Sequence, residues 1–242
     1  MSRWWPERAL VRVGAAAGGR AAVGTAPAAA RLEALVEGFE RDLDARELPA
    51  RSRLTVVLGG EAVRYRIVSG EAGAGAAERD ATAVQAFAGD HHEDAARWRV
   101  RVHPARTDKP TLACATDAGL LDRLEAVARS RRLTLASLQP ALMQAYNANR
   151  RQLPPAAWFA WLEGAWITLL LTTPDGPQYV RHAIDDRADL SRLAARASFT
   201  LGLDGDMPPL HIDCLPSHEA DRVDEGEAVG LHAPVRSATA SA

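Results

Sequence analysis

An amphipathic helical segment followed closely by a short, mostly apolar segment is the feature that most constrains the fold. Between about residues 27 and 47, apolar side chains recur at i, i+3, i+4 and i+7 on one face: Leu32, Leu35, Val36, Phe39 and Leu43. The segment Leu54–Leu58 that follows is too short for a helix and is typical of a strand buried on both faces. A helix beside such a strand predicts an α/β protein.

Other segments carry their own periodicity and turn signals. Residues 98–102 alternate most clearly, with Trp98, Val100 and Val102 between arginines. Gly18-Gly19 and Gly59-Gly60 predict tight turns. Strands are expected over 9–14, 20–24, 54–58, 63–67, 98–102, 110–116, 133–136, 158–162, 166–173, 178–184 and 209–214, and helices over 27–47, 78–88, 117–131, 140–149 and 189–201.

Composition excludes several classes of function. The net charge of −2 provides no field that would gather nucleic acid or anionic lipid. No apolar segment reaches the roughly 20 residues of a membrane span, and the N-terminus lacks the pattern of a signal peptide. Lys109 is the only lysine. Cys114 lies in an apolar strand and is expected to pack as a small core residue, while a disulfide with Cys214 is left open.

The order of elements resembles the actin-like cytoplasmic proteins of bacterial envelope machines, namely PilM of type IV pilus assembly and the cytoplasmic part of GspL of type II secretion. The resemblance covers about residues 9–200. It is carried by the run LTVVLGGEAVRYRIV, a tryptophan-containing strand, the run LTLASLQP before a helix, and three strands after Pro154-Pro155. It implies an α/β, actin-like (RNase H-like) ATPase-type fold with an incomplete second half and a small inserted α/β subdomain.

The resemblance also implies a division into parts. Residues 1–77 would form the first actin-like subdomain and 78–152 the inserted α/β subdomain with its connecting helices. Residues 153–215 would form a partial second half, and 216–242 a disordered tail. Because few elements follow residue 184, the nucleotide cleft is expected to be incomplete and to bind nucleotide weakly or not at all.

In that fold, two turns with the pattern Asp-x-Gly hold the nucleotide phosphates and the metal ion. The first would be Arg12-Val13-Gly14, where arginine replaces the acid. The second would be Leu162-Glu163-Gly164, where Leu162 stands at the acid position. Glu163 comes one residue late, which in a strand turns a side chain to the opposite face. The resemblance therefore implies degenerate phosphate turns, with no bound cofactor and no catalytic residue.

The function that the resemblance implies is a non-catalytic scaffold, or pseudo-ATPase, in a type IV pilus or type II secretion-like machine. It would be cytoplasmic and peripheral to the inner membrane, bound to a short cytoplasmic segment of a membrane assembly protein. No nucleic acid and no direct membrane span are expected, and a homodimer is compatible with the sequence. The candidate partner-binding residues are Arg97, Trp98, Arg99 and Arg101.

Two alternatives remain open. One is a nucleotide-binding ATPase of the same fold that holds ATP and Mg²⁺, with Glu163 in place of the missing acid. The other is a small hydrolase built around His182, His211 or His218. The cluster His91-His92-Glu93-Asp94 has no second cluster at a ligand-like spacing. The cluster His211-x-Asp213-Cys214-x-x-x-His218 offers several ligand types at short range but lies where order is expected to fade, so no metal is expected. Trp4 and Trp5 are expected to pack into the sheet, with a partner contact as the alternative.

Overall fold

The structure is a computed structural model, and it describes residues 8–14, 28–69, 75–91, 94–102, 109–184, 190–203 and 207–214. The predicted strand over 20–24, the tryptophans at 4 and 5, and the tail from 216 lie outside these residues. Within the described part of the chain no helix is long and apolar enough to span a membrane.

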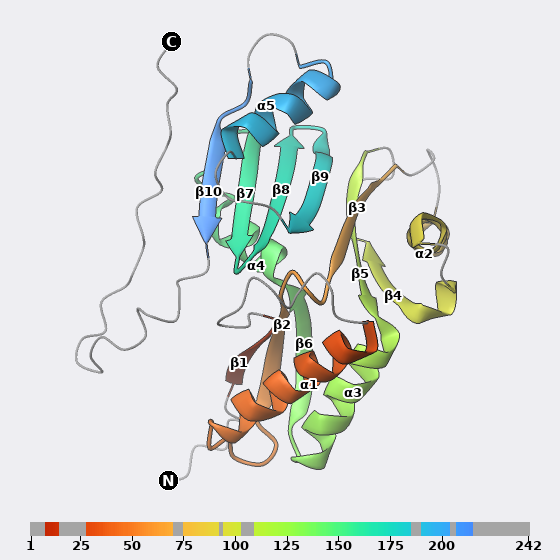
Figure 1. Cartoon of the computed structure of the whole chain (residues 1–242), viewed down its shortest axis with the longest axis vertical. Coiled ribbons are helices and arrows are strands. Elements are labelled where there is room, and N and C mark those ends of the chain that lie inside the picture. The colour runs from red at the N-terminus through yellow and green to blue at the C-terminus, as the bar shows by residue number, and fades with distance from the viewer. Residues whose placement is uncertain are drawn as a thin grey trace, which may run out of the picture.

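The described elements follow in an order close to the predicted one. They are β1 (Arg8–Val13), α1 (Ala28–Asp44), β2 (Arg53–Leu58), β3 (Arg64–Val68), α2 (Ala76–His91), the 3₁₀ turn η1 (Ala95–Arg97), β4 (Trp98–Val102), β5 (Thr111–Asp117), α3 (Ala118–Ser130), β6 (Thr134–Pro140), α4 (Ala141–Asn149), β7 (Ala157–Glu163), β8 (Trp166–Thr173), β9 (Gly176–Ile184), α5 (Leu190–Thr200) and β10 (Leu210–Cys214). Figure 1 shows how they gather into separate sheets with helices packed on them.

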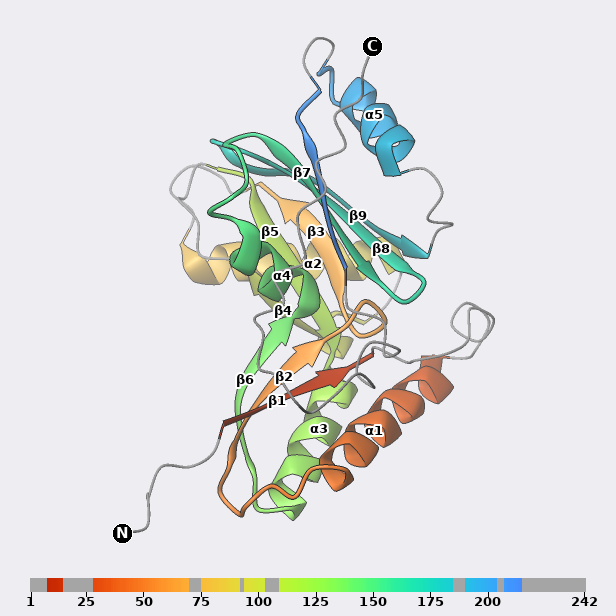
Figure 2. The same ribbon diagram turned by 90° about the vertical axis from the view of Figure 1, so that its left-hand side faces the viewer.

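The first sheet has the parallel order β1-β2-β6, with β2 in the centre as its apolar sequence predicts. Helices α1 and α3 cover one face of this sheet (Figure 2). Phe39 of α1 and Leu120 and Leu124 of α3 are fully buried there against Val11 and Val56 of the strands. Asp117 begins α3 as predicted, because its carboxylate accepts hydrogen bonds from the N–H groups of residues 119 and 120.

The second sheet is small and antiparallel, in the order β3-β5-β4. Helix α2 covers one face of it, and Phe87 and Val100 are buried between the helix and the sheet. The Gly59-Gly60 segment therefore leads from the first sheet into the second. It makes no hairpin between β2 and β3, because β3 pairs with β5 instead.

The third sheet has the order β10-β7-β8-β9, in which β7, β8 and β9 form the predicted meander and β10 lies parallel to β7. Helix α5 packs on one face, over Trp158 and Leu169. Helix α4 lies between the other face and the first sheet, where Leu142 contacts Phe159 and Val57. Helix α4 therefore joins the cores of the first and third sheets.

The predicted boundaries at residues 77 and 152 do not coincide with the sheets, because the segments 1–77 and 78–152 each contribute elements to both the first and the second sheet. Strand β3, from the segment before 77, pairs with β5 of the segment after it. Helix α3 and strand β6, from the segment 78–152, pack with the first sheet. The chain thus leaves the first core after β2 and returns to it at α3, and the two boundaries stay predictions.

Candidate functional site

The carboxyl ends of β1 and β2 meet at one edge of the first sheet, because the two strands are parallel. The N–H of Gly59 donates to the carbonyl oxygen of Val13 at 2.7 Å, which fixes the end of one strand to the other. Gly14 has a φ of +101°, a region that side chains other than glycine's rarely adopt. The first predicted phosphate turn therefore lies directly beside Gly59-Gly60.

Glu163, at the end of β7 in the third sheet, reaches across to this edge. Its Oε2 accepts a hydrogen bond from the Gly60 N–H at 2.9 Å and another from Trp161 Nε1 at 3.4 Å. The side chain is only 3% exposed. A Cβ on Gly59 would collide with the Glu163 carboxylate, whose carbon would lie 2.9 Å away. The carboxylate thus lies directly against the backbone of Gly59 and Gly60.

Glu163, and not Leu162, is the residue of the second turn that faces the first sheet. Alternation along β7 places Trp161 and Glu163 on one face and Leu162 on the other, where Leu162 packs against the core beneath α5. The placement of Leu162 at the acid position stays a prediction from the resemblance, while the side chain that reaches the edge of the first sheet is that of Glu163. Gly164 has a φ of +58° and shapes the turn into β8, as the sequence predicts.

Arg12, at the position of the missing acid in the first turn, is close enough to Glu163 for its charge to act on that carboxylate. Its Nη1 is buried and has no hydrogen-bond partner among the described residues. Burial raises the pKa of Glu163, while the hydrogen bonds from Gly60 and Trp161 and the charge of Arg12 act in the opposite direction. A buried cation therefore lies close to the Glu163 carboxylate at this edge of the sheet.

His182 of β9 makes a second connection to the same glycine. Its Nε2 lies 2.8 Å from the Gly60 carbonyl oxygen and its Nδ1 lies 2.8 Å from Thr168 Oγ1. Because a carbonyl only accepts, Nε2 carries the proton and Nδ1 accepts from the threonine hydroxyl. Trp166 stacks on the imidazole, with ring centroids 4.6 Å apart. Both nitrogens of the imidazole are engaged within the protein.

The environment of His182 keeps it neutral. Its pKa is lowered to about 4, chiefly by burial; the hydrogen bond with Gly60 opposes this shift and the charge of Arg64 contributes to it. The hydroxyl that bonds to it, on Thr168, is itself only 2% exposed. This arrangement holds two sheets together and does not offer the base and accessible nucleophile of the hydrolase alternative.

A pocket of about 60 Å³ lies between the first sheet's helices and the small second sheet. It is large enough for a few water molecules. The lining residues come from α1, α3, the Gly60–β3 connection and the start of β4: Arg31, Leu32, Leu35, Glu61, Ala62, Arg64, Arg97, Trp98, Asp117 and Leu120. The pocket therefore lies where the helices of the first sheet meet the connection to the second sheet and the start of β4.

The four predicted partner-binding residues divide into two groups. Arg97 and Trp98 line the pocket, whereas Arg99 and Arg101 are exposed on the edge strand β4 and do not. Arg97 Nε is held by Asp117 Oδ2 at 2.8 Å, and its guanidinium lies 5.7 Å from the Trp98 ring centroid. The apparent arginine stripe is thus split by the change from the 3₁₀ turn to the strand.

The other candidate residues lie partly outside the described part of the chain. His91 ends α2, His92 and Glu93 lie outside the described residues, and so does His218. His211 and Asp213 lie on β10, where Asp213 accepts a hydrogen bond from Asn149 Nδ2 at 2.7 Å. Among the described residues no group of three or more His, Cys, Asp or Glu could hold a metal ion. Cys114 and Cys214 are free thiols, and burial raises the pKa of Cys114 to about 11.

Sequence reasoning missed Gly60, Trp166 and His182 as members of one constellation. Only the lone acid at the end of an otherwise apolar strand was a usable signal, since period-two alternation places Glu163 on the face of Trp161. The contacts with Gly60 span separations of 103 and 122 residues, which no local pattern reports.

Comparison with known proteins gives structural matches. No protein-family profile matches the chain, and no curated protein sequence does. A Bacteroides thetaiotaomicron protein of unknown function with an actin-like ATPase fold matches with a TM-score of 0.53 and 10% identity, over 77% of this chain and 70% of that one. The chain therefore has an actin-like fold, as the element order predicts.

Two further solved structures belong to the types of protein that the sequence resembles. The PilM–PilN type IV pilus biogenesis complex matches with a TM-score of 0.47 and 16% identity, over 69% of this chain and 53% of that chain. The cytoplasmic domain of EpsL, an inner membrane component of the Vibrio cholerae type II secretion system, matches with a TM-score of 0.48 and 15% identity, over 74% and 68%. The chain spans about half the length of the pilus protein.

Proposed function

We propose that this protein is a non-catalytic component of a bacterial type IV pilus or type II secretion-like machine. It acts at the cytoplasmic face of the inner membrane and binds a short cytoplasmic segment of a membrane protein of that machine. The single observation that carries the non-catalytic part is the Glu163 carboxylate bound to the Gly60 N–H at 2.9 Å. The actin-like fold and the resemblance in element order support the type of machine.

The residues at the sheet edge do not fit a magnesium-bound nucleotide. A phosphate at Gly59-Gly60 would meet a buried carboxylate of like charge, which is strongly unfavourable in a site shielded from water. The Gly60 N–H that would bind it already has an acceptor. Arg12 provides a cation where a metal ion would need an acid ligand. These features favour a protein whose role is binding and not ATP hydrolysis.

A nucleotide titration tests the first half of the proposal. The wild-type protein should show no heat of binding when Mg-ATP is added to about 1 mM, because the Glu163 carboxylate would repel a phosphate at this edge. Absence of binding at this concentration means a Kd above about 1 mM, or less than about 4 kcal/mol of binding free energy. Isothermal titration calorimetry makes the measurement, with the phosphate-release assay run on the same sample. Submicromolar binding with turnover would refute the non-catalytic proposal in favour of the ATPase alternative.

The pocket beneath α1 is the proposed partner site. Its walls combine the apolar side chains of Leu32, Leu35 and Leu120 with charged groups of both signs. Burial raises the pKa of Glu61, and the charge of Arg31 opposes that rise. A peptide with an apolar residue next to an acid would match the apolar floor and the arginines at the rim.

Substitutions of the pocket residues should weaken peptide binding, whereas substitutions of the exposed arginines on β4 should not. The probe is a fluorescent peptide in which a leucine stands next to a glutamate, the pattern expected to match this pocket. Arg31→Glu and Arg97→Ala should each weaken its binding about tenfold, since loss of a charged contact at such a site costs about 1.4 kcal/mol or more. Arg101→Ala, a matched change outside the pocket, should leave the anisotropy titration unchanged. Equal loss in all three variants would exclude the pocket as the docking site.

A further inference from the structure

The second and third sheets meet along a seam in which β3 lies beside β9 (Figures 1 and 2). One end of the seam is closed at Gly60, which donates its N–H to Glu163 and accepts a hydrogen bond at its carbonyl from His182. A neighbouring ring contact, Tyr65 against His182 with centroids 5.3 Å apart, continues the closure along β3. The third sheet is thus joined by side chains to the segment that leads from the first sheet into the second.

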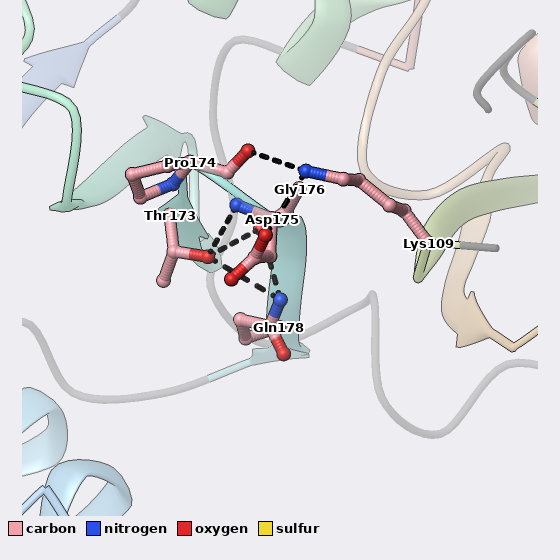
Figure 3. A network of polar contacts seen from close by, with 6 residues as sticks. All are labelled: Lys109, Thr173, Pro174, Asp175, Gly176 and Gln178. Carbon is pink, nitrogen blue, oxygen red and sulfur yellow. Dashed lines mark hydrogen bonds and ion pairs between the residues drawn. The ribbon is translucent and has the colours of Figure 1, made fainter.

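The other end of the seam is closed by the only lysine of the chain. Figure 3 shows Lys109, just before β5, against the turn between β8 and β9. Its Nζ donates to the Pro174 carbonyl oxygen at 3.1 Å and to Asp175 Oδ1 at 2.9 Å. Gly176 permits the approach, because a Cβ there would lie 2.8 Å from the Pro110 carbonyl oxygen. The chemical reactivity of the Lys109 amine should therefore depend on whether the second and third sheets are in contact.

The charges at the Gly60 end are the reverse of those that the fold would use with a nucleotide. There an acid of the first turn holds a metal ion, and the anionic phosphates lie between the halves. Here the first turn contributes the cation Arg12, and the second half contributes the anion Glu163, which is buried against the glycines. Opposite charges on the two halves attract without a metal ion or phosphate between them.

We propose that Glu163 is a built-in anion that binds the Gly60 N–H, with the charge of Arg12 in favour of its ionised form, and holds the end of β7 against the first sheet without nucleotide. This inference rests on the proposed non-catalytic function, since a nucleotide bound at this edge would displace the carboxylate. It goes further by assigning the contact between the sheets to a charged side chain of the chain itself. Removal of the carboxylate should leave an anion site next to the Gly60 N–H and Trp161 Nε1.

A small carboxylate tests the assignment. The full chain is prepared as wild type, Glu163→Ala and Glu163→Gln, and circular dichroism checks that each is folded. The rate of acylation of Lys109 by an N-hydroxysuccinimide ester is followed by peptide mass spectrometry, with and without sodium formate at constant ionic strength. Since the chain has one lysine, the signal is separate from that of the N-terminal amine.

The rate of acylation of Lys109 should rise about tenfold in Glu163→Ala. Loss of the hydrogen bond from the Gly60 N–H to the buried carboxylate should loosen the seam, and with it the contact of Lys109 with the β8–β9 turn. Formate should return the rate toward the wild-type value. Formate should have no effect on wild type or on Glu163→Gln, in which the site is filled. An unchanged rate in Glu163→Ala, or a formate effect equal in all three proteins, overturns the proposal. If Glu163→Ala does not fold, the Glu163→Gln variant decides. A Lys109 acylation rate equal to that of the wild type would then show that the negative charge of Glu163 is not needed, and would also overturn the proposal.

The formate experiment contains neither nucleotide nor peptide, so its outcome is independent of the tests of the proposed function. Tight Mg-ATP binding by the wild type would remove the non-catalytic function, whatever formate does. Failure of formate would remove only the role assigned to Glu163 and would leave the partner-binding proposal to its own assay.

Discussion

Replacement of Gly60 by alanine is expected to lower the free energy of unfolding by about 3 kcal/mol, because overpacking a tight site and misaligning two buried hydrogen bonds add together. An added Cβ would lie 2.7 Å from Trp166 Cγ and 2.8 Å from its Cβ. These atoms adjoin the backbone of β8 and cannot rotate away as the end of a flexible side chain would. The third sheet would have to move from the first, which strains the contacts with Glu163 and His182.

Gly38 provides a matched control for this substitution. It lies inside α1, and a Cβ there would meet nothing within 4 Å. Gly38→Ala should therefore stabilise the protein by about 0.5 to 1 kcal/mol through its better helix propensity. Both variants are compared with wild type by urea unfolding monitored by tryptophan fluorescence. A Gly60→Ala variant as stable as wild type would contradict the close contact between the sheets.

Acid should destabilise the protein through His182. Its pKa is lowered from 6.5 to about 4 by burial, so the unfolded chain binds this proton more tightly than the folded protein does. The stabilising contribution of the neutral ring is complete above pH 6.5 and is lost as the pH falls toward 4. The loss over this window is about 3 kcal/mol, from about 1.4 kcal/mol for each pH unit between the two pKa values.

His182→Gln removes this titration and serves as the reference, since other groups also titrate between pH 7 and pH 4. Glu163 acts in the opposite direction, because its raised pKa makes the folded state bind a proton more readily as the pH falls. Arg64 and Tyr65 of β3 also face the imidazole and stay in one charge state in this range. The wild-type free energy of unfolding should fall by about 3 kcal/mol more than that of the variant. Parallel pH curves would show that His182 is not held neutral by burial.

The elements with strong local signals were predictable. The alternation around Val100, the helical face containing Phe39 and the cap at Asp117 each depend on residues a few positions apart, so the sequence alone locates them. Even the end of the apolar strand β7 at Glu163-Gly164 was visible. The arginine stripe at Arg97–Arg101 was misleading as one surface, because a 3₁₀ turn and a strand place successive side chains differently.

The sequence by itself determined that this chain is an α/β protein, whereas the replacement of acids at Arg12 and Leu162 stays a prediction from the resemblance. It could not say which face of β7 would meet the first sheet, because period-two alternation fixes only that Leu162 and Glu163 point oppositely. The tertiary structure decided this by packing the partly buried Leu162 against the core beneath α5 and bringing Glu163 and His182 onto Gly60. Contacts between residues more than a hundred positions apart therefore decide which side chain of β7 lies at the edge of the first sheet.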